Sequence, residues 1–275
     1  MKLNKIKTGI ATLTAVATIF GYSMLARAED KKFIEFESVG AQVEVTSRQG
    51  PDSNVTSIKE IIDLNMKKND FNINIQGSHA DHFGKIDGKK ARGNDETIKL
   101  EVGKKMSEDL YLSGRLEVKD DVDPIREFGN KNVASFGLGV NGEYIIKKPV
   151  TIIGDVKGSA LTNGDKDYST NLGLRYYLGD KDWIDVKGTH WRESIKDTNT
   201  TMGYVSGNHE FNKKLSGKAY VGVGKESGKS DETAVNAGAG LSYKLSEKVK
   251  VNVGYDYNQG KSKNHTVGVG LTWRF

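Results

Sequence analysis

Cysteine is absent from the chain. Stability therefore does not come from disulfides, and thiolate nucleophiles and cysteine-ligated metal sites are excluded. After residue 28 the chain also lacks an apolar stretch approaching the roughly 20 residues that a membrane helix needs. If the protein spans a membrane, it must do so as a closed barrel, because only helices and closed barrels satisfy every backbone polar group in lipid.

The one long apolar run lies at the start of the chain. The basic segment MKLNKIK precedes the apolar TGIATLTAVATIFGYSML, and the small residues Ala26 and Ala28 follow. This layout predicts a secretory signal peptide over 1–28, cleaved after Ala28, and leaves 29–275 as the mature domain. A single membrane helix is the alternative, but Thr, Gly and Ser dilute the run and no basic cluster follows it.

The apparent basicity of the chain belongs mainly to this targeting segment. Four of the 41 basic residues lie within 1–28, whereas all 36 acidic residues lie beyond it. The mature chain therefore carries 37 basic residues against 36 acidic ones. The pI near 9.0 does not support a nucleic-acid partner, and none is expected.

Period-two alternation dominates the mature chain, and the helical period is nearly absent. FNINIQG (71–77), TNLGLRYYL (170–178) and KVKVNVGYDY (248–257) each have one apolar face and one polar face. The pattern predicts strands near 33–47, 57–67, 71–83, 96–104, 110–119, 132–146, 150–160, 168–178, 183–193, 200–211, 215–225, 233–245, 248–258 and 265–275. The expected fold is all-β, a transmembrane antiparallel up-and-down β-barrel of fourteen strands, with twelve or sixteen left open.

Two local features refine this prediction. The segment FIEFESVG shifts the alternating phase before AQVEV, which predicts a bulge in the first strand. Short connections alternate with longer polar ones, as in a barrel with turns at one end and loops at the other. The longer connections are expected at 48–56, 84–95, 120–131 and 226–232.

Aromatic residues recur on the apolar face at a nearly constant spacing. Tyr144, Tyr176, Phe211, Tyr243 and Phe275 are separated by 32, 35, 32 and 32 residues, about one hairpin with its connections. Each aromatic therefore returns to one level beside a short turn. This predicts an aromatic girdle at a membrane interface, whereas aromatics in the core of a soluble sandwich would share no such level.

The segment VGVGLTWRF, with alternating apolar residues and a terminal aromatic, resembles the C-terminal strand of Gram-negative outer-membrane β-barrels. Together with the alternation over the whole mature chain, it resembles the small monomeric porins of that class. The resemblance implies localisation in the outer-membrane bilayer, capture by the barrel assembly machinery, and passive diffusion of ions and small hydrophilic solutes. The insertion signal implied by the resemblance comprises Val267, Val269, Leu271, Trp273 and Phe275. The edge of this strand is expected to close on the first strand, near 39–45.

If the apolar face meets lipid, the opposite face lines a lumen. That face is charged, and buried unpaired charges would be costly, so a water-filled lumen is expected. The predicted pore-lining residues are Lys59, Asp63, Lys99, Glu101, Arg115, Glu117, Asp155, Lys157, Arg175, Asp185, Lys187, Lys218 and Asp256. Cations slightly outnumber anions in mid-strand, which suggests weak preference for anions or acidic sugars; paired charges with little selectivity are the simpler alternative.

The sequence offers little support for a catalytic site or a metal site. The five histidines lack HExxH spacing, and His79 and His82 in SHADHF are expected at the edge of an outer loop. Ser78 or Ser206 could be paired with His79, His190 or His209, but alternation places neighbours in sequence on opposite faces, which disfavours a serine hydrolase. We therefore expect no enzyme, no metal and no cofactor. The alternatives to a porin are a surface adhesin or receptor on a plugged barrel, and a barrel lipid hydrolase.

Overall fold

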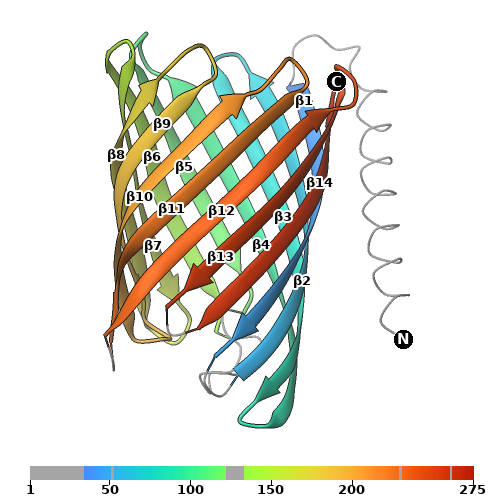
Figure 1. The fold of residues 1–275 in the computed structure, drawn as a ribbon, viewed down its shortest axis with the longest axis vertical. Helices are drawn as coiled ribbons and strands as arrows, with labels where there is room; N and C mark the ends of the chain where they lie inside the picture. Colours follow the sequence, from blue (N-terminus) through green and yellow to red (C-terminus); the bar gives the residue numbers. More distant parts are fainter. Residues whose placement is uncertain (1–33, 51–52, 122–132, 229–230, 261) are drawn as a thin grey trace.

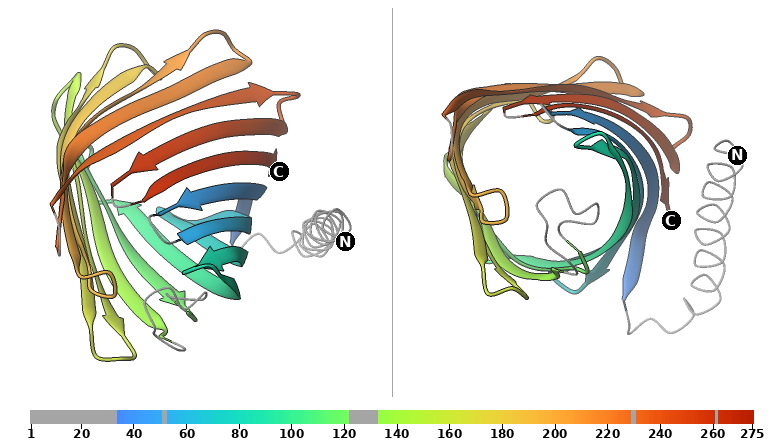
Figure 2. Two further views of the ribbon diagram at one scale, coloured as in Figure 1. Left: turned by 60° about the horizontal axis from the view of Figure 1, so that its bottom comes forward. Right: turned by 90° about the horizontal axis from the view of Figure 1, so that it is seen from below.

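The computed structural model describes residues 34–50, 53–121, 133–228, 231–260 and 262–275. They form fourteen antiparallel strands closed into one barrel, in which each strand pairs with its neighbours in sequence and β1 pairs with β14 (Figures 1 and 2). The predicted up-and-down barrel and its count of fourteen strands are confirmed. Among the described residues, no helix has the length and hydrophobicity required to cross a membrane. The predicted signal peptide over 1–28 lies outside the described residues.

The strand bounds follow the alternating segments. The first seven strands are β1 (Glu35–Gln49), β2 (Ser53–Lys68), β3 (Phe71–Ile86), β4 (Lys89–Lys105), β5 (Leu110–Lys119), β6 (Ser135–Lys147) and β7 (Val150–Leu161). The remaining seven are β8 (Lys166–Tyr177), β9 (Trp183–Glu193), β10 (Thr198–Glu210), β11 (Leu215–Ser227), β12 (Glu232–Lys244), β13 (Val249–Gln259) and β14 (Lys263–Arg274).

Closure of the barrel joins β1 to β14. Val39 lies opposite Trp273 and Val45 opposite Val267, so the last strand pairs with residues 39–45 of the first strand, as predicted. The backbone N–H of Phe275 also donates to the carbonyl of Glu37 at 3.2 Å. The register between β1 and β2 shifts between Phe36 and Ser38, which confirms the predicted bulge.

Two faces alternate along every strand. Residues opposite each other in an antiparallel pair point to the same side, so one row of register partners shares one face of the wall. The outward face exposes large apolar side chains: Leu172 is 67% exposed, Leu138 58% and Val186 58%. The same register places the charged side chains of the strands mostly on the inner face. This arrangement suits a wall with lipid outside and water inside.

The connections differ from the prediction at one end of the barrel. Segment 84–95, expected as a long loop, belongs to β3 and β4, which meet in a turn at Asp87 and Gly88 with φ of 50° and 74°. Both residues adopt the left-handed backbone that Asp-Gly turns favour, so the hairpin extends beyond the neighbouring strands (Figure 1). Segment 48–56 is also mostly strand, because β1 ends at Gln49 and β2 begins at Ser53. His79 and His82 consequently lie within β3 rather than at a loop edge.

The opposite end, which carries the short turns and Phe275, is called the turn end below; the other is the loop end. The turn between β8 and β9 is tied to β10 through Asp182. Its carboxylate accepts the backbone N–H of Glu210 at 2.8 Å and contacts Nδ1 of His209 at 2.8 Å. These two hydrogen bonds hold the pKa of Asp182 below its ordinary value, and the one from the Glu210 backbone has the larger effect.

Candidate functional site: the barrel lumen

The thirteen predicted pore-lining residues all lie on the inner face of the wall. One row of register partners runs from Asp63 through Gln76, Lys99 and Glu117 to Gly137, across β2 to β6. A second row pairs Arg175 directly with Asp185, where the sequence left the facing of β9 ambiguous. The structure thus brings these side chains to one surface; that the surface conducts solutes is a proposal made below.

The first cluster on this wall is built around Glu101 of β4. Arg115 donates to Oε2 of Glu101 from Nε at 3.2 Å and from Nη2 at 3.1 Å. Oε1 accepts the hydroxyl of Ser113 at 2.8 Å and the amide of Asn141 at 3.0 Å. Four donors therefore hold one carboxylate flat against the wall over β4, β5 and β6.

The second cluster crosses a strand that carries glycine. Lys157 of β7 reaches over β6 to Glu117 of β5, with Nζ 2.7 Å from Oε1. A Cβ at Gly137 of β6 would lie 3.1 Å from Cε of Lys157, so a larger residue there would obstruct the lysine. Lys99 approaches the same carboxylate at 3.6 Å. Glu117 is thus shared by two lysines from opposite sides.

The third cluster buries a charge. Arg175 forms a bidentate pair with Asp185, with distances of 2.8 Å and 3.1 Å, while Glu143 lies 3.5 Å from the guanidinium. The guanidinium also stacks over Trp183, 4.4 Å from the ring centroid. Asp185 is only 1% exposed, so this pair is desolvated on the carboxylate side.

Two inward tyrosines lie along the wall because the next strand carries glycine. A Cβ at Gly222 would lie 2.4 Å from the ring of Tyr204, and a Cβ at Gly238 would lie 2.4 Å from the ring of Tyr220. Each ring therefore covers a glycine and reaches one strand further. Tyr220 donates to Asp256 at 2.7 Å, and Tyr204 accepts from Asn236 at 2.5 Å. Glycine on the inner face thus leaves space that long side chains occupy.

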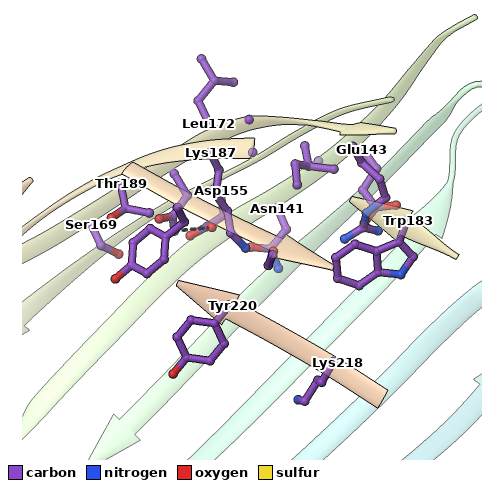
Figure 3. A pocket seen from close by; sticks show the side chains of 18 of the residues that line it. Asn141, Glu143, Asp155, Ser169, Leu172, Trp183, Lys187, Thr189, Lys218 and Tyr220 are labelled. Atoms are coloured by element: carbon purple, nitrogen blue, oxygen red, sulfur yellow. Dashed lines mark hydrogen bonds and ion pairs between the residues drawn. The ribbon is translucent and has the colours of Figure 1, made fainter. Parts of the chain in front are cut away.

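A cavity of about 730 Å³ lies along β4 to β12 and holds free cationic groups. Lys187 and Lys218 line it (Figure 3), and neither makes an ion pair with any residue that the structure describes. The lining carboxylate of Asp155, by contrast, accepts a bond from the amide of Asn171 at 2.6 Å. The cavity thus contains two lysine ammonium groups without an ion pair and a carboxylate whose hydrogen-bond donor is a neutral amide.

The predicted girdle residues share the turn end of the barrel. Tyr144, Tyr176, Phe211, Tyr243 and Phe275 are between 41% and 56% exposed, and each lies within three residues of the end of its strand. The predicted insertion residues of β14 alternate on the outer face, with Val269 52% exposed and Trp273 51%. Their roles at an interface and in insertion remain predictions.

Sequence reasoning missed several side chains. On the outer face at the loop end, the hydroxyl of Tyr255 is hydrogen-bonded to Nδ1 of His265 at 2.8 Å. The hydroxyl of Tyr168 is likewise 3.2 Å from Nε2 of His190. A period-two reading places these residues outward, but their spacing does not match the series at the other end. On the inner face, the sequence does not predict that Ser57 lies beside His82, because the register of β2 against β3 is not visible in it.

Metal ligation finds no support in the part of the chain that the structure describes. No group of three or more acidic or histidine side chains there is arranged to hold an ion. His79 and His82, three residues apart, point to opposite faces. His79 lies 3.7 Å from Glu96 on the outer face, and His82 lies 2.6 Å from Asp95 on the inner face.

The comparisons with known proteins bear on the fold. No family model matches the chain, and no curated protein matches it. Among solved structures it is similar to the CymD monoaromatic hydrocarbon channel (TM-score 0.63, 11% identity, 88% of this chain and 89% of that chain). It is also similar to a TodX monoaromatic hydrocarbon channel mutant (0.60, 8%, 88% and 90%) and to a bacterial polysaccharide outer membrane secretin (0.55, 8%, 86% and 98%). The chain has the fold of outer-membrane β-barrel proteins.

Proposed function

We propose that the protein is an outer-membrane porin through which ions and small hydrophilic solutes diffuse passively. The observation that carries the proposal is the inner wall, where charged side chains from β2 to β13 surround a lumen within a closed barrel. Such a wall must be hydrated, because unpaired charges in a dry interior would be strongly destabilising. Lipid would meet the exposed apolar face, and the barrel assembly machinery would insert the chain.

The wall chemistry also supports a weak preference for anions, including acidic sugars. Lys187 and Lys218 line the cavity without a partner among the described residues. An ammonium on a flexible four-carbon stem can reorient its three donors toward a passing carboxylate. The compared channels are named for monoaromatic hydrocarbons, but the charged wall described here favours hydrophilic solutes.

Planar-bilayer recording of the purified, refolded mature chain tests this function. We expect stepwise ion currents and, under a salt gradient, a reversal potential with the sign of weak anion selectivity. A reversal potential that indicates cation selectivity would overturn the proposed anion preference but would still support the proposed porin function. Absence of any stepwise current from protein shown to be folded would overturn the porin and favour a plugged barrel that serves as a surface adhesin or receptor.

A further inference from the structure

Three polar side chains form a continuous chain of contacts on the inner wall, toward the loop end of β2, β3 and β4. Oγ of Ser57 lies 2.7 Å from Nδ1 of His82. Nε2 of the same ring lies 2.6 Å from Oδ2 of Asp95. Both distances are those of hydrogen bonds, and the three residue types are those of a serine nucleophile, its base and the group that orients the base.

The register explains how these side chains meet. Ser57 and His82 are direct partners between β2 and β3. On its other side His82 faces Gly93 of β4, which has no side chain, and Asp95 faces the small Ala80. The imidazole can therefore lean diagonally across β4 to Asp95. The side chain of Asp95 is 6% exposed, and Nζ of Lys119 lies 3.4 Å from it.

The hydrogen-bond pattern sets the tautomer that a general base needs. An ionised carboxylate only accepts hydrogen bonds, so Asp95, beside the ammonium of Lys119, accepts a hydrogen bond from the N–H of Nε2. Nδ1 of the neutral imidazole is then the acceptor, and the hydroxyl of Ser57 donates to it. The lone pair of His82 is thus aimed at the proton that a nucleophilic serine must lose.

A cation is available on the same face for developing negative charge. Lys59 follows Ser57 by two residues, which places it on the same side of β2, about 6.6 Å along the strand. Within the described part of the chain, Lys59 makes no ion pair. Backbone N–H groups in the middle of a sheet are already paired with neighbouring strands, so a lysine ammonium is the donor able to stabilise an oxyanion here.

We propose that Ser57, His82 and Asp95 form a site that cleaves carboxylic esters of water-soluble solutes in the lumen. Oγ of Ser57 attacks the ester carbonyl while Nδ1 of His82 takes its proton. The bond to the alkoxy group then breaks, the departing alcohol receives that proton, and the acyl group remains on Ser57. Water, deprotonated by His82, releases the carboxylic acid and restores the serine. Because the site faces the lumen, acyl chains of membrane lipids on the outer face cannot reach it.

The test uses the refolded mature chain with a fluorophosphonate probe and with p-nitrophenyl acetate. Attack on the probe forms a bond from Ser57 to phosphorus and expels fluoride, so peptide mass spectrometry should locate the label on Ser57. We expect Ser57→Ala to abolish labelling and ester hydrolysis above background. His82→Gln should slow both reactions by about 100-fold or more, the usual scale of general base catalysis.

The matched control is Ser78→Ala, which removes a serine from the inner face of β3 that pairs with Ile61 and Thr97. It should leave labelling and hydrolysis unchanged, and heat-modifiable gel migration should show that every variant is folded. Failure of the folded wild-type chain to label at Ser57, or equal labelling of the folded His82→Gln variant, would overturn the proposal. Single-channel conductance of Ser57→Ala should match the wild type, which separates this activity from diffusion through the lumen.

Discussion

The carboxylate of Asp185 is only 1% exposed, less than any other charged side chain that the structure describes. Its partner Arg175 is itself 19% exposed and holds both oxygens. A buried pair of this kind is weak support for stability as a pair, but removing one partner leaves a desolvated charge uncompensated. Removal of Arg175 is therefore expected to destabilise the lumen wall.

The substitution Arg175→Met tests this point. We expect the free energy of unfolding to fall by about 3–5 kcal/mol, because methionine removes the guanidinium and leaves Asp185 buried. Urea unfolding of the barrel in lipid vesicles measures the change.

The control for this prediction is Lys181→Met, which removes an ion pair with Glu210 in which the lysine is 62% exposed. An exposed pair is worth about 0–1 kcal/mol, so this variant should unfold near the wild type. A similar small loss in Arg175→Met would mean that water reaches Asp185 and that the pair is not desolvated.

At the scale of an element, β14 is the strand whose neighbours decide whether the barrel closes. Along its whole length β14 pairs with β13 at one edge and with β1 at the other, and Phe275 adds a backbone bond to Glu37. Phe275 is 41% exposed, an exposure similar to that of the other predicted girdle residues. Phe275 is thus placed to complete closure, and its recognition by an assembly machinery is a prediction.

Deleting Phe275 separates these two roles. We expect folded, membrane-inserted protein in cells to fall several-fold, while refolding of the purified chain into detergent proceeds, because only one backbone bond is lost. Heat-modifiable migration reports the folded fraction in both settings.

Phe275→Tyr keeps an aromatic ring at the end of the chain and should retain assembly in cells. Wild-type levels of folded protein in the deletion variant would show that the terminal aromatic is not an insertion signal. Loss of refolding in detergent as well would assign its role to closure.

For the whole molecule, the lumen has a mixed wall in which most charges are paired or hydrogen-bonded. Glu101, Glu117 and Asp185 are each held by two or more donors. Selectivity then depends on the charges that have no ion-pair partner, among them Lys187, Lys218 and Asp155 of the described residues. Long-range fields contribute less, because exposed charges are screened beyond about 10 Å at 0.1 M salt.

The double variant Lys187→Glu/Lys218→Glu should therefore move the reversal potential toward cation selectivity. The matched control, Lys213→Glu/Lys214→Glu, changes net charge equally on the exposed turn between β10 and β11. Its reversal potential should stay near the wild type in about 0.1 M salt, where screening limits distant charges. Equal shifts in both variants would show that overall charge, rather than the wall of the lumen, sets selectivity.

The sequence by itself determined the facing of most of the wall and predicted fourteen strands, although twelve or sixteen stayed open. Alternation is local, since each residue's side follows from its neighbours in the same strand, so the inward positions of Lys99 and Glu117 were predictable, whereas the facing of Asp185 needed the pairing of β9 with β8. The break of phase near Phe36 was predictable for the same reason.

Only the tertiary structure decided which side chains meet. Contacts between side chains of different strands depend on the register of those strands and on the size of the residues between them. Neither can be predicted from the sequence of a single strand. Gly137 lets Lys157 reach Glu117, and the register of β2 against β3 brings Ser57 to His82. The long β3–β4 hairpin was missed because polar residues in 84–95 read as a loop, although pairing across the Asp87–Gly88 turn satisfies their backbone groups.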